Sequence, residues 1–139
     1  MTLDDPISSI MTAGPETVTS TMPLVRVQDI LFRAHVHHVP VTHERRLLGI
    51  VSTNDLLRVI GGDLYAPAHE VMAALERLTA GEAMSTEVVT VGPDEPIRRA
   101  VEILRVGSFH ALPVVDDGEL VGIVTTGDLL GLLLTRDGD

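Results

Sequence analysis

The sequence predicts a mixed α/β (α+β) fold in which a β-α-β-β-α pattern occurs twice. The first observation is an internal repeat in the 139-residue chain. Residues 11–60 align without a gap with the residues 73 positions further on, so that Met11 aligns with Met84. The second is that short β-rich runs alternate with helix-spaced apolar residues in each copy. Because a copy of roughly 50 residues buries little apolar surface alone, we expect the two copies to pack as one pseudo-symmetric module.

The two copies share residue types in the same order, which chance does not explain. The matching runs are Thr17-Val18 and Thr90-Val91, Pro40-Val41 and Pro113-Val114, Gly49-Ile50-Val51 and Gly122-Ile123-Val124, and Asp55-Leu56-Leu57 and Asp128-Leu129-Leu130. These runs lie where strands and helix starts are expected, so the repeat is a repeat of structure.

Each copy begins with a β-rich run, at residues 16–20 and 88–92, which predicts a first strand. A helix follows, because Pro23 and Pro96 suit a first helical turn and apolar residues then recur at helical spacing. A hairpin comes next, and a second helix is expected from near Thr53 and Thr126. The expected hairpin strands are 39–42 and 47–52 in the first copy, and 112–116 and 120–125 in the second.

Asp117-Gly118 is a strong two-residue hairpin turn, and Glu44-Arg45 takes its place in the first copy. The predicted domains are a first repeat over residues 1–62, a connector with a helix over 63–78, and a second repeat over 79–139.

Composition excludes several classes of function. The formal net charge is −10 and only three residues are aromatic, so neither phosphate contacts nor base stacking with a nucleic acid are expected. There is no cysteine, and no apolar run reaches membrane-spanning length. The start of the chain lacks the basic and apolar regions of a signal peptide, so we expect a cytoplasmic protein with no membrane partner.

No catalytic pattern is present, so the sequence predicts that the chain is not an enzyme. Neither a nucleophile triad nor a Gly-rich phosphate loop is found, and each Asp-Leu-Leu carboxylate lacks an acid–base partner. The His35-Val-His-His run invites a metal site. However, His37 and His38 alternate across a strand, and no carboxylate stands at a ligand-like spacing, so no metal is expected.

The repeated motifs resemble the CBS motif. They are Val-His-His-Val-Pro-Val and Phe-His-Ala-Leu-Pro-Val, each followed by Gly-Ile-Val-Ser/Thr-Thr-x-Asp-Leu-Leu, and they cover almost the whole chain. The resemblance implies a paired, or Bateman, module that forms a homodimer and stands alone. It further implies a regulatory function in which AMP, ADP, ATP or S-adenosylmethionine binds between the motifs and alters contacts with an unknown partner protein. No cofactor is required. The alternative is a ligand-free module that dimerises and docks to another protein.

The resemblance also implies binding residues. The matching Ser52 and Thr125 would contact phosphate, and Asp55 and Asp128 would hold the ribose hydroxyls. A hydroxyl at the end of a strand beside a helix N-terminus suits an anion. The alternative is structural: Thr53 and Thr126 would be N-caps and the two aspartates first-turn acids.

Further candidates lie on the strands. Thr17 and Thr90 would contact the base or the phosphate, or would simply be β-favouring residues. His37 and His38, with His110 and Ala111 in the second copy, occupy positions that face the phosphates in the family, or serve as surface residues. Arg58 follows Asp55 by one helical turn, where it is either a solvated charge or a phosphate contact; Gly131 replaces it in the second copy.

Overall fold

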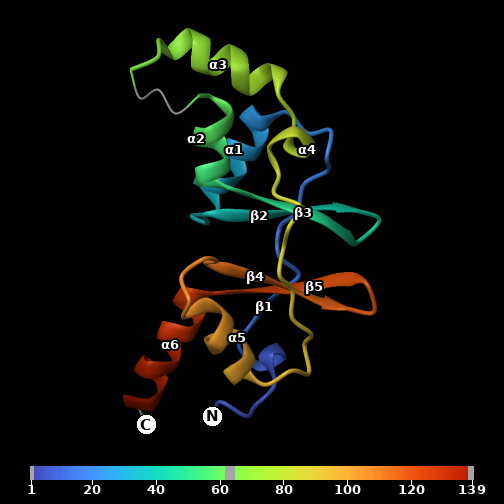
Figure 1. Ribbon diagram of the computed structural model, residues 1–139, viewed down its shortest axis with the longest axis vertical. Helices are drawn as coiled ribbons and strands as arrows, with labels where there is room; N and C mark the ends of the chain where they lie inside the picture. The colour runs from blue at the N-terminus through green and yellow to red at the C-terminus, as the bar shows by residue number, and fades with distance from the viewer. Residues whose placement is uncertain (1, 62–64, 138–139) are drawn as a thin grey trace. The chain divides into compact units, whose positions relative to one another are not determined.

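The computed structural model describes residues 2–61 and 65–137, and both repeats form the predicted mixture of helices and antiparallel strands (Figure 1). The predicted boundary between residues 62 and 63 lies outside the described residues. The elements are η1 (Ile7–Ser9), β1 (Thr12–Ala13), α1 (Leu24–Arg33), β2 (His38–His43), β3 (Arg46–Ser52), α2 (Thr53–Val59), α3 (Ala68–Arg77), α4 (Ala80–Ala83), α5 (Ile97–Leu104), β4 (Ala111–Asp116), β5 (Glu119–Thr125) and α6 (Thr126–Asp137).

The chain divides into two compact units, and each unit contains one repeat. The first-repeat unit is residues 16–87, and the second-repeat unit is residues 88–139 together with residues 1–15. The lead-in of each repeat therefore packs with the other repeat: α4 lies in the first-repeat core and η1 in the second-repeat core. The expected division into 1–62, 63–78 and 79–139 follows chain order. The two units do not follow chain order, because each includes the segment that precedes the other repeat.

The core of the first-repeat unit lies between its helices and the β2–β3 hairpin. The apolar face of α1 is buried there, as its spacing predicts, and Leu75 of α3 joins it with 2% of its surface exposed. α3 lies within the residues expected to form the connector, and it contributes to the core of the first-repeat unit. Figure 1 shows α1 and α2 on the same side of the hairpin. The second-repeat unit buries the corresponding face of α5 with Leu112, Val114 and Val124.

Both hairpins turn through two residues with positive φ. Asp117 and Gly118 have φ of 52° and 81°, and Glu44 and Arg45 have φ of 49° and 72°. This backbone is that of a type I′ turn, which matches the twist of antiparallel strands. The turns predicted from both copies are therefore confirmed. In the first copy, Glu44 and Arg45 adopt a conformation that favours Asn and Gly.

The predicted first strands, 16–20 and 88–92, are reduced to one parallel bridge each, Val18 with Val41 and Val91 with Val114. Val18 donates to the carbonyl of Pro40 at 3.0 Å, and Val91 donates to that of Pro113 at 3.1 Å. The next ladder bond toward the N-terminus needs an N–H from these same prolines. Because proline has no N–H, the ladder stops there.

Candidate functional site

The junction between β3 and α2 is a capping box. Ser52 is the N-cap: its hydroxyl accepts a hydrogen bond from the Asp55 N–H at 3.1 Å, and the Asp55 carboxylate accepts one from the Ser52 N–H at 2.8 Å. Two orphan donors of the helix start are thereby satisfied. Thr53 is not the cap, contrary to the structural alternative above; it is the first helical residue, and its N–H donates to the carbonyl of His37 at 3.1 Å.

The junction between β5 and α6 repeats this arrangement. The Thr125 N–H donates to Asp128 Oδ2 at 2.8 Å, and the Asp128 N–H donates to the Thr125 hydroxyl at 3.2 Å. Thr126 begins the helix, and its N–H donates to the carbonyl of His110 at 3.2 Å. The predicted hydroxyl and carboxylate are thus adjacent in both repeats. Each aspartate is a first-turn acid, as the structural alternative proposed.

The two carboxylates differ in their remaining partners. Asp55 Oδ1 accepts hydrogen bonds from Arg58 Nη2 at 3.1 Å and from the Ser85 hydroxyl at 3.2 Å. Arg58 Nη2 also donates to the carbonyl of Ala83 at 2.9 Å. Asp55 is 8% exposed and is the one buried charged residue among those described. Within residues 2–61 and 65–137, Asp128 Oδ1 accepts no hydrogen bond, and Asp128 is half-buried.

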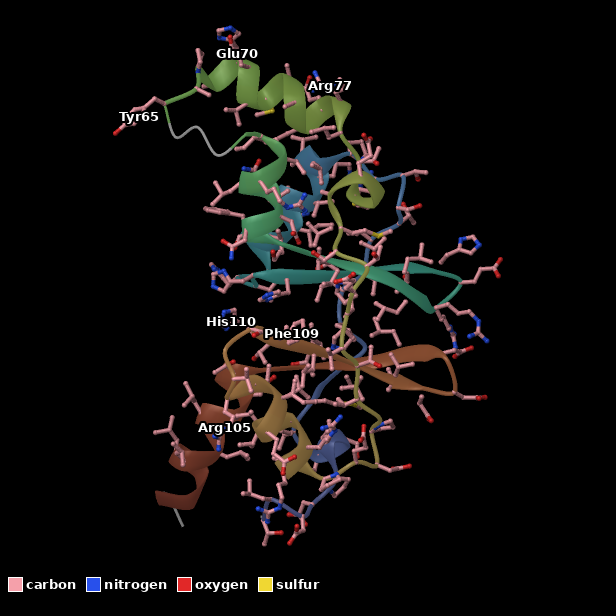
Figure 2. All side chains as sticks on the ribbon, viewed as in Figure 1. Tyr65, Glu70, Arg77, Arg105, Phe109 and His110 are labelled. Carbon is pink, nitrogen blue, oxygen red and sulfur yellow. The ribbon has the colours of Figure 1, made fainter. Side chains whose placement is uncertain are left out.

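The histidine positions lie beside these junctions. The strand register pairs His38 with Ser52 and Ala111 with Thr125. The start of β2 therefore adjoins the end of β3, and the start of β4 adjoins the end of β5. His37 and His110 are exposed, His38 is half-buried and Ala111 is buried. Figure 2 shows His110 next to Phe109, where the chain enters β4.

Thr17 and Thr90 are exposed and lie apart from the junctions. Thr17 precedes Val18, which bridges to β2, whereas Ser52 lies on β3 at the other edge of the hairpin. Thr90 precedes Val91 in the same way, and Val91 bridges to β4. In each repeat, the helix-capping Ser52 or Thr125, the Asp and the start of the first hairpin strand therefore lie together. Thr17 and Thr90 are separated from this group by one strand.

A mostly apolar groove of about 530 Å³ lies in the first-repeat unit. It falls in the size range of small-molecule sites. It is lined by Gln28, Leu31, Phe32, His35, Val36, His37, Thr53, Leu56, Leu57, Ile60, Val71 and Leu75. The groove thus borders the entry to β2 and the first turn of α2.

Among the described residues, no group of three or more His, Asp or Glu side chains is arranged to hold a metal ion. No helix in the part of the chain that the structure describes has the length and apolar content to cross a bilayer.

Sequence reasoning missed the contacts of Arg58 and Ser85. Arg58 is not a purely solvated charge, because its Nη2 donates to Asp55 Oδ1 and to the carbonyl of Ala83, although 59% of its side chain is exposed. Its spacing of three residues from Asp55 was a usable signal for an ion pair. Ser85 is 30 residues from Asp55 in sequence, and the bond depends on the bridge that Ser85 forms with Ile50. The sequence held one indirect signal, since Ser85 aligns with another hydroxyl residue, Thr12, at the 73-residue offset.

The fold and its two capped junctions define a tandem pair of matching α/β repeats. The family model for the CBS domain matches residues 7–62 and 80–135, and the chain belongs to this family. The CBS motif inferred from the sequence is therefore confirmed. CBS domain pairs are generally regulatory and not catalytic.

The relatives include whole enzymes and isolated pairs. The chain is 30% identical over 129 residues to homoserine O-acetyltransferase of Methanohalobium evestigatum, covering 91% of this chain but 24% of the relative. The CBS pair of protein MJ0100, in a complex with 5′-methylthioadenosine and S-adenosyl-L-methionine, is 26% identical with a TM-score of 0.74, covering 94% of this chain and 97% of that one. The CBS-pair protein CBSX2 of Arabidopsis thaliana, 24% identical with a TM-score of 0.84 over 97% and 98% of the two chains, shares the fold.

Proposed function

We propose that this CBS domain pair is a regulatory module that binds an adenosine-containing ligand and thereby alters its contacts with a partner protein. The candidate ligands are AMP, ADP, ATP, S-adenosylmethionine and its analogue 5′-methylthioadenosine. The MJ0100 pair, at 26% identity, has two such ligands in its complex, which supports this class. CBSX2, which shares the fold at 23% identity, has a complex with AMP.

The observation that carries the proposal is the unpaired oxygen of Asp128. Its Oδ2 bonds to Thr125, which fixes the side chain, whereas Oδ1 has no partner among the described residues. A ribose has two adjacent hydroxyls, and both can donate to one ionised carboxylate. Such charge-assisted bonds are stronger than bonds between neutral groups.

The other candidate residues are proposed to contact the rest of the ligand. Thr125 stands at a helix N-terminus, where a phosphate is favoured. Thr90, His110 and Ala111 are the remaining proposed contacts in the second repeat, and the matching candidates in the first repeat are Thr17, His37, His38, Ser52 and Asp55. With three aromatic residues in the whole chain, the adenine would lie against aliphatic side chains.

A ligand-free docking module is the second candidate. One observation favours it: α6 exposes Leu130, Leu133 and Leu134 by 60%, 57% and 77%. These side chains suit burial against another protein surface.

A thermal-shift screen followed by calorimetry separates the two candidates. The probes are adenosine, AMP, ADP, ATP, 5′-methylthioadenosine and S-adenosylmethionine, with GMP as the control for the base. A ligand that binds only the native state raises the melting temperature by mass action. We expect at least one adenosine compound to do so and GMP not to. No shift and no heat with all six adenosine compounds would leave the docking function.

A further inference from the structure

We propose that the two repeats have different roles in ligand binding. Asp128 binds the ligand, whereas the carboxylate of Asp55 is already occupied by hydrogen bonds from its own unit and does not bind one. We call the group of Asp55, Arg58 and Ser85 the Asp55 latch. This inference rests on the proposed function, and it adds how many ligands one chain binds and which residue sets that number.

The lone pairs of the two carboxylates support the difference. An ionised carboxylate accepts about four hydrogen bonds. Asp55 receives four: two from the N–H and hydroxyl of Ser52 on Oδ2, and two from Arg58 and Ser85 on Oδ1. Asp128 receives two, both from Thr125 and both on Oδ2. A ribose diol therefore finds free acceptor sites on Asp128 and none on Asp55.

The charges around the two aspartates support the same difference between the repeats. Arg58 Nη2 lies 3.1 Å from Asp55 Oδ1, so the cation offsets the negative charge that would attract the ligand hydroxyls. At the corresponding position of α6 stands Gly131, which has no side chain to reach Asp128. Thr12, which matches Ser85 in its bridge to the hairpin, donates no hydrogen bond to Asp128 within the described residues.

The latch is also tied to the fold of its unit. Arg58 donates to the carbonyl of Ala83 at the end of α4, and Ser85 forms an antiparallel bridge with Ile50. Displacing Arg58 from Asp55 would disturb a contact between α2 and the segment that follows α3. A ligand would have to replace these bonds before gaining its own.

A substitution at Gly131 can introduce into the second repeat the arginine contact that occupies Asp55. A Cβ built at Gly131 meets no atom within 4 Å, and Gly131 lies three residues after Asp128, as Arg58 lies three after Asp55. Gly131→Arg should place a guanidinium on Asp128 Oδ1. Gly131→Met fills similar space without the cation, so it separates the latch from simple crowding.

The experiment is calorimetry with AMP and, separately, 5′-methylthioadenosine, on the wild type and five variants. We expect one ligand per chain for the wild type and for Asp55→Asn, with affinities within about twofold of each other. Asp128→Asn and Gly131→Arg should each weaken binding about tenfold or more, because a lost charge-assisted bond costs at least about 1.4 kcal/mol. Gly131→Met should bind as the wild type does. Melting temperatures report whether each variant is folded.

The outcomes distinguish this inference from the proposed function. Two ligands per chain in the wild type, or a loss in Asp55→Asn equal to that in Asp128→Asn, would overturn the latch while leaving nucleotide binding intact. Equal weakening by Gly131→Arg and Gly131→Met would also overturn it, by showing that bulk and not charge closes the site. No binding of either probe by any folded variant would reject the proposed function itself. A second ligand gained by Arg58→Met, which removes the guanidinium but keeps helix propensity, would support the latch from the other side.

Discussion

The backbone of Gly49 packs directly against the carbonyl oxygen of Ser85. At this point β3 and the segment after α4 are bridged by mutual hydrogen bonds between Ile50 and Ser85, at 3.0 and 2.9 Å. A Cβ at Gly49 would lie 2.7 Å from the Ser85 oxygen and 2.8 Å from Met84 Sδ. Gly122 has the matching place in the second-repeat unit, against Met11 and the Thr12 carbonyl. The lead-in of each repeat is therefore seated on a glycine of the other repeat's hairpin.

Gly49→Ala and Gly122→Ala should each destabilise the protein by about 1–3 kcal/mol, because the added methyl overpacks a backbone contact. Urea unfolding measures the loss. The control is Gly131→Ala in α6, where the Cβ has open space; it should be neutral or stabilise by up to about 1 kcal/mol through helix propensity. Loss of stability in Gly131→Ala as large as in Gly49→Ala would contradict the packing argument.

The aspartates should also differ in their effect on stability without ligand. Asp55→Ala removes a buried acceptor and leaves Arg58 and Ser85 without it, so the expected cost is about 1–3 kcal/mol above that of a lost cap. Asp128→Ala removes only the bonds with Thr125, and its expected cost is about 1 kcal/mol.

Urea unfolding of both variants in ligand-free buffer checks this difference. Arg58→Met should recover part of the Asp55→Ala loss when the two are combined, since the two residues interact directly. Equal losses for Asp55→Ala and Asp128→Ala, with additive effects of Arg58→Met, would mean that the Asp55 latch contributes nothing to the fold.

The two hairpin turns offer a third test. Glu44→Asn should stabilise the first hairpin by a few tenths of a kcal/mol, because Asn tolerates the positive φ of 49° better than Glu does. Gly118→Ala should destabilise the second by about 1 kcal/mol, because φ there is 81°. Thermal unfolding measures both changes. The turn argument fails if the two substitutions change the melting temperature in the same direction.

The repeat allowed much of this fold to be predicted. Hairpins and helices depend on local signals, so Asp117-Gly118 and the apolar spacing after Pro96 were sufficient to place them. The proline itself is the N-cap and not a helical residue, a one-position difference typical of helix boundaries. The first strands were overestimated because β propensity does not register that Pro40 lacks an N–H on the neighbouring strand.

The candidate site could be predicted only in part. The hydroxyl–carboxylate pair is a local pattern, and the sequence located it in both repeats. Its asymmetry is not local: it depends on Ser85, which reaches Asp55 only because the lead-in of the second repeat packs in the first-repeat unit. Arg58 against Gly131 was visible as a difference, but which group Arg58 bonds could not be read from spacing alone.

The last prediction concerns assembly: the chain should sediment as a homodimer at micromolar concentration. Leu130, Leu133 and Leu134 expose a contiguous apolar face along one helix, and burying it between two copies is favourable. Leu130→Glu combined with Leu134→Glu should shift the protein to monomer without unfolding it, since both side chains are more than half exposed in the single chain. Ser8→Glu adds charge at an exposed polar position and should remain dimeric. Sedimentation velocity decides the point: a wild-type monomer would reject the dimer, and a dimer that persists in the double variant would place its interface on another surface.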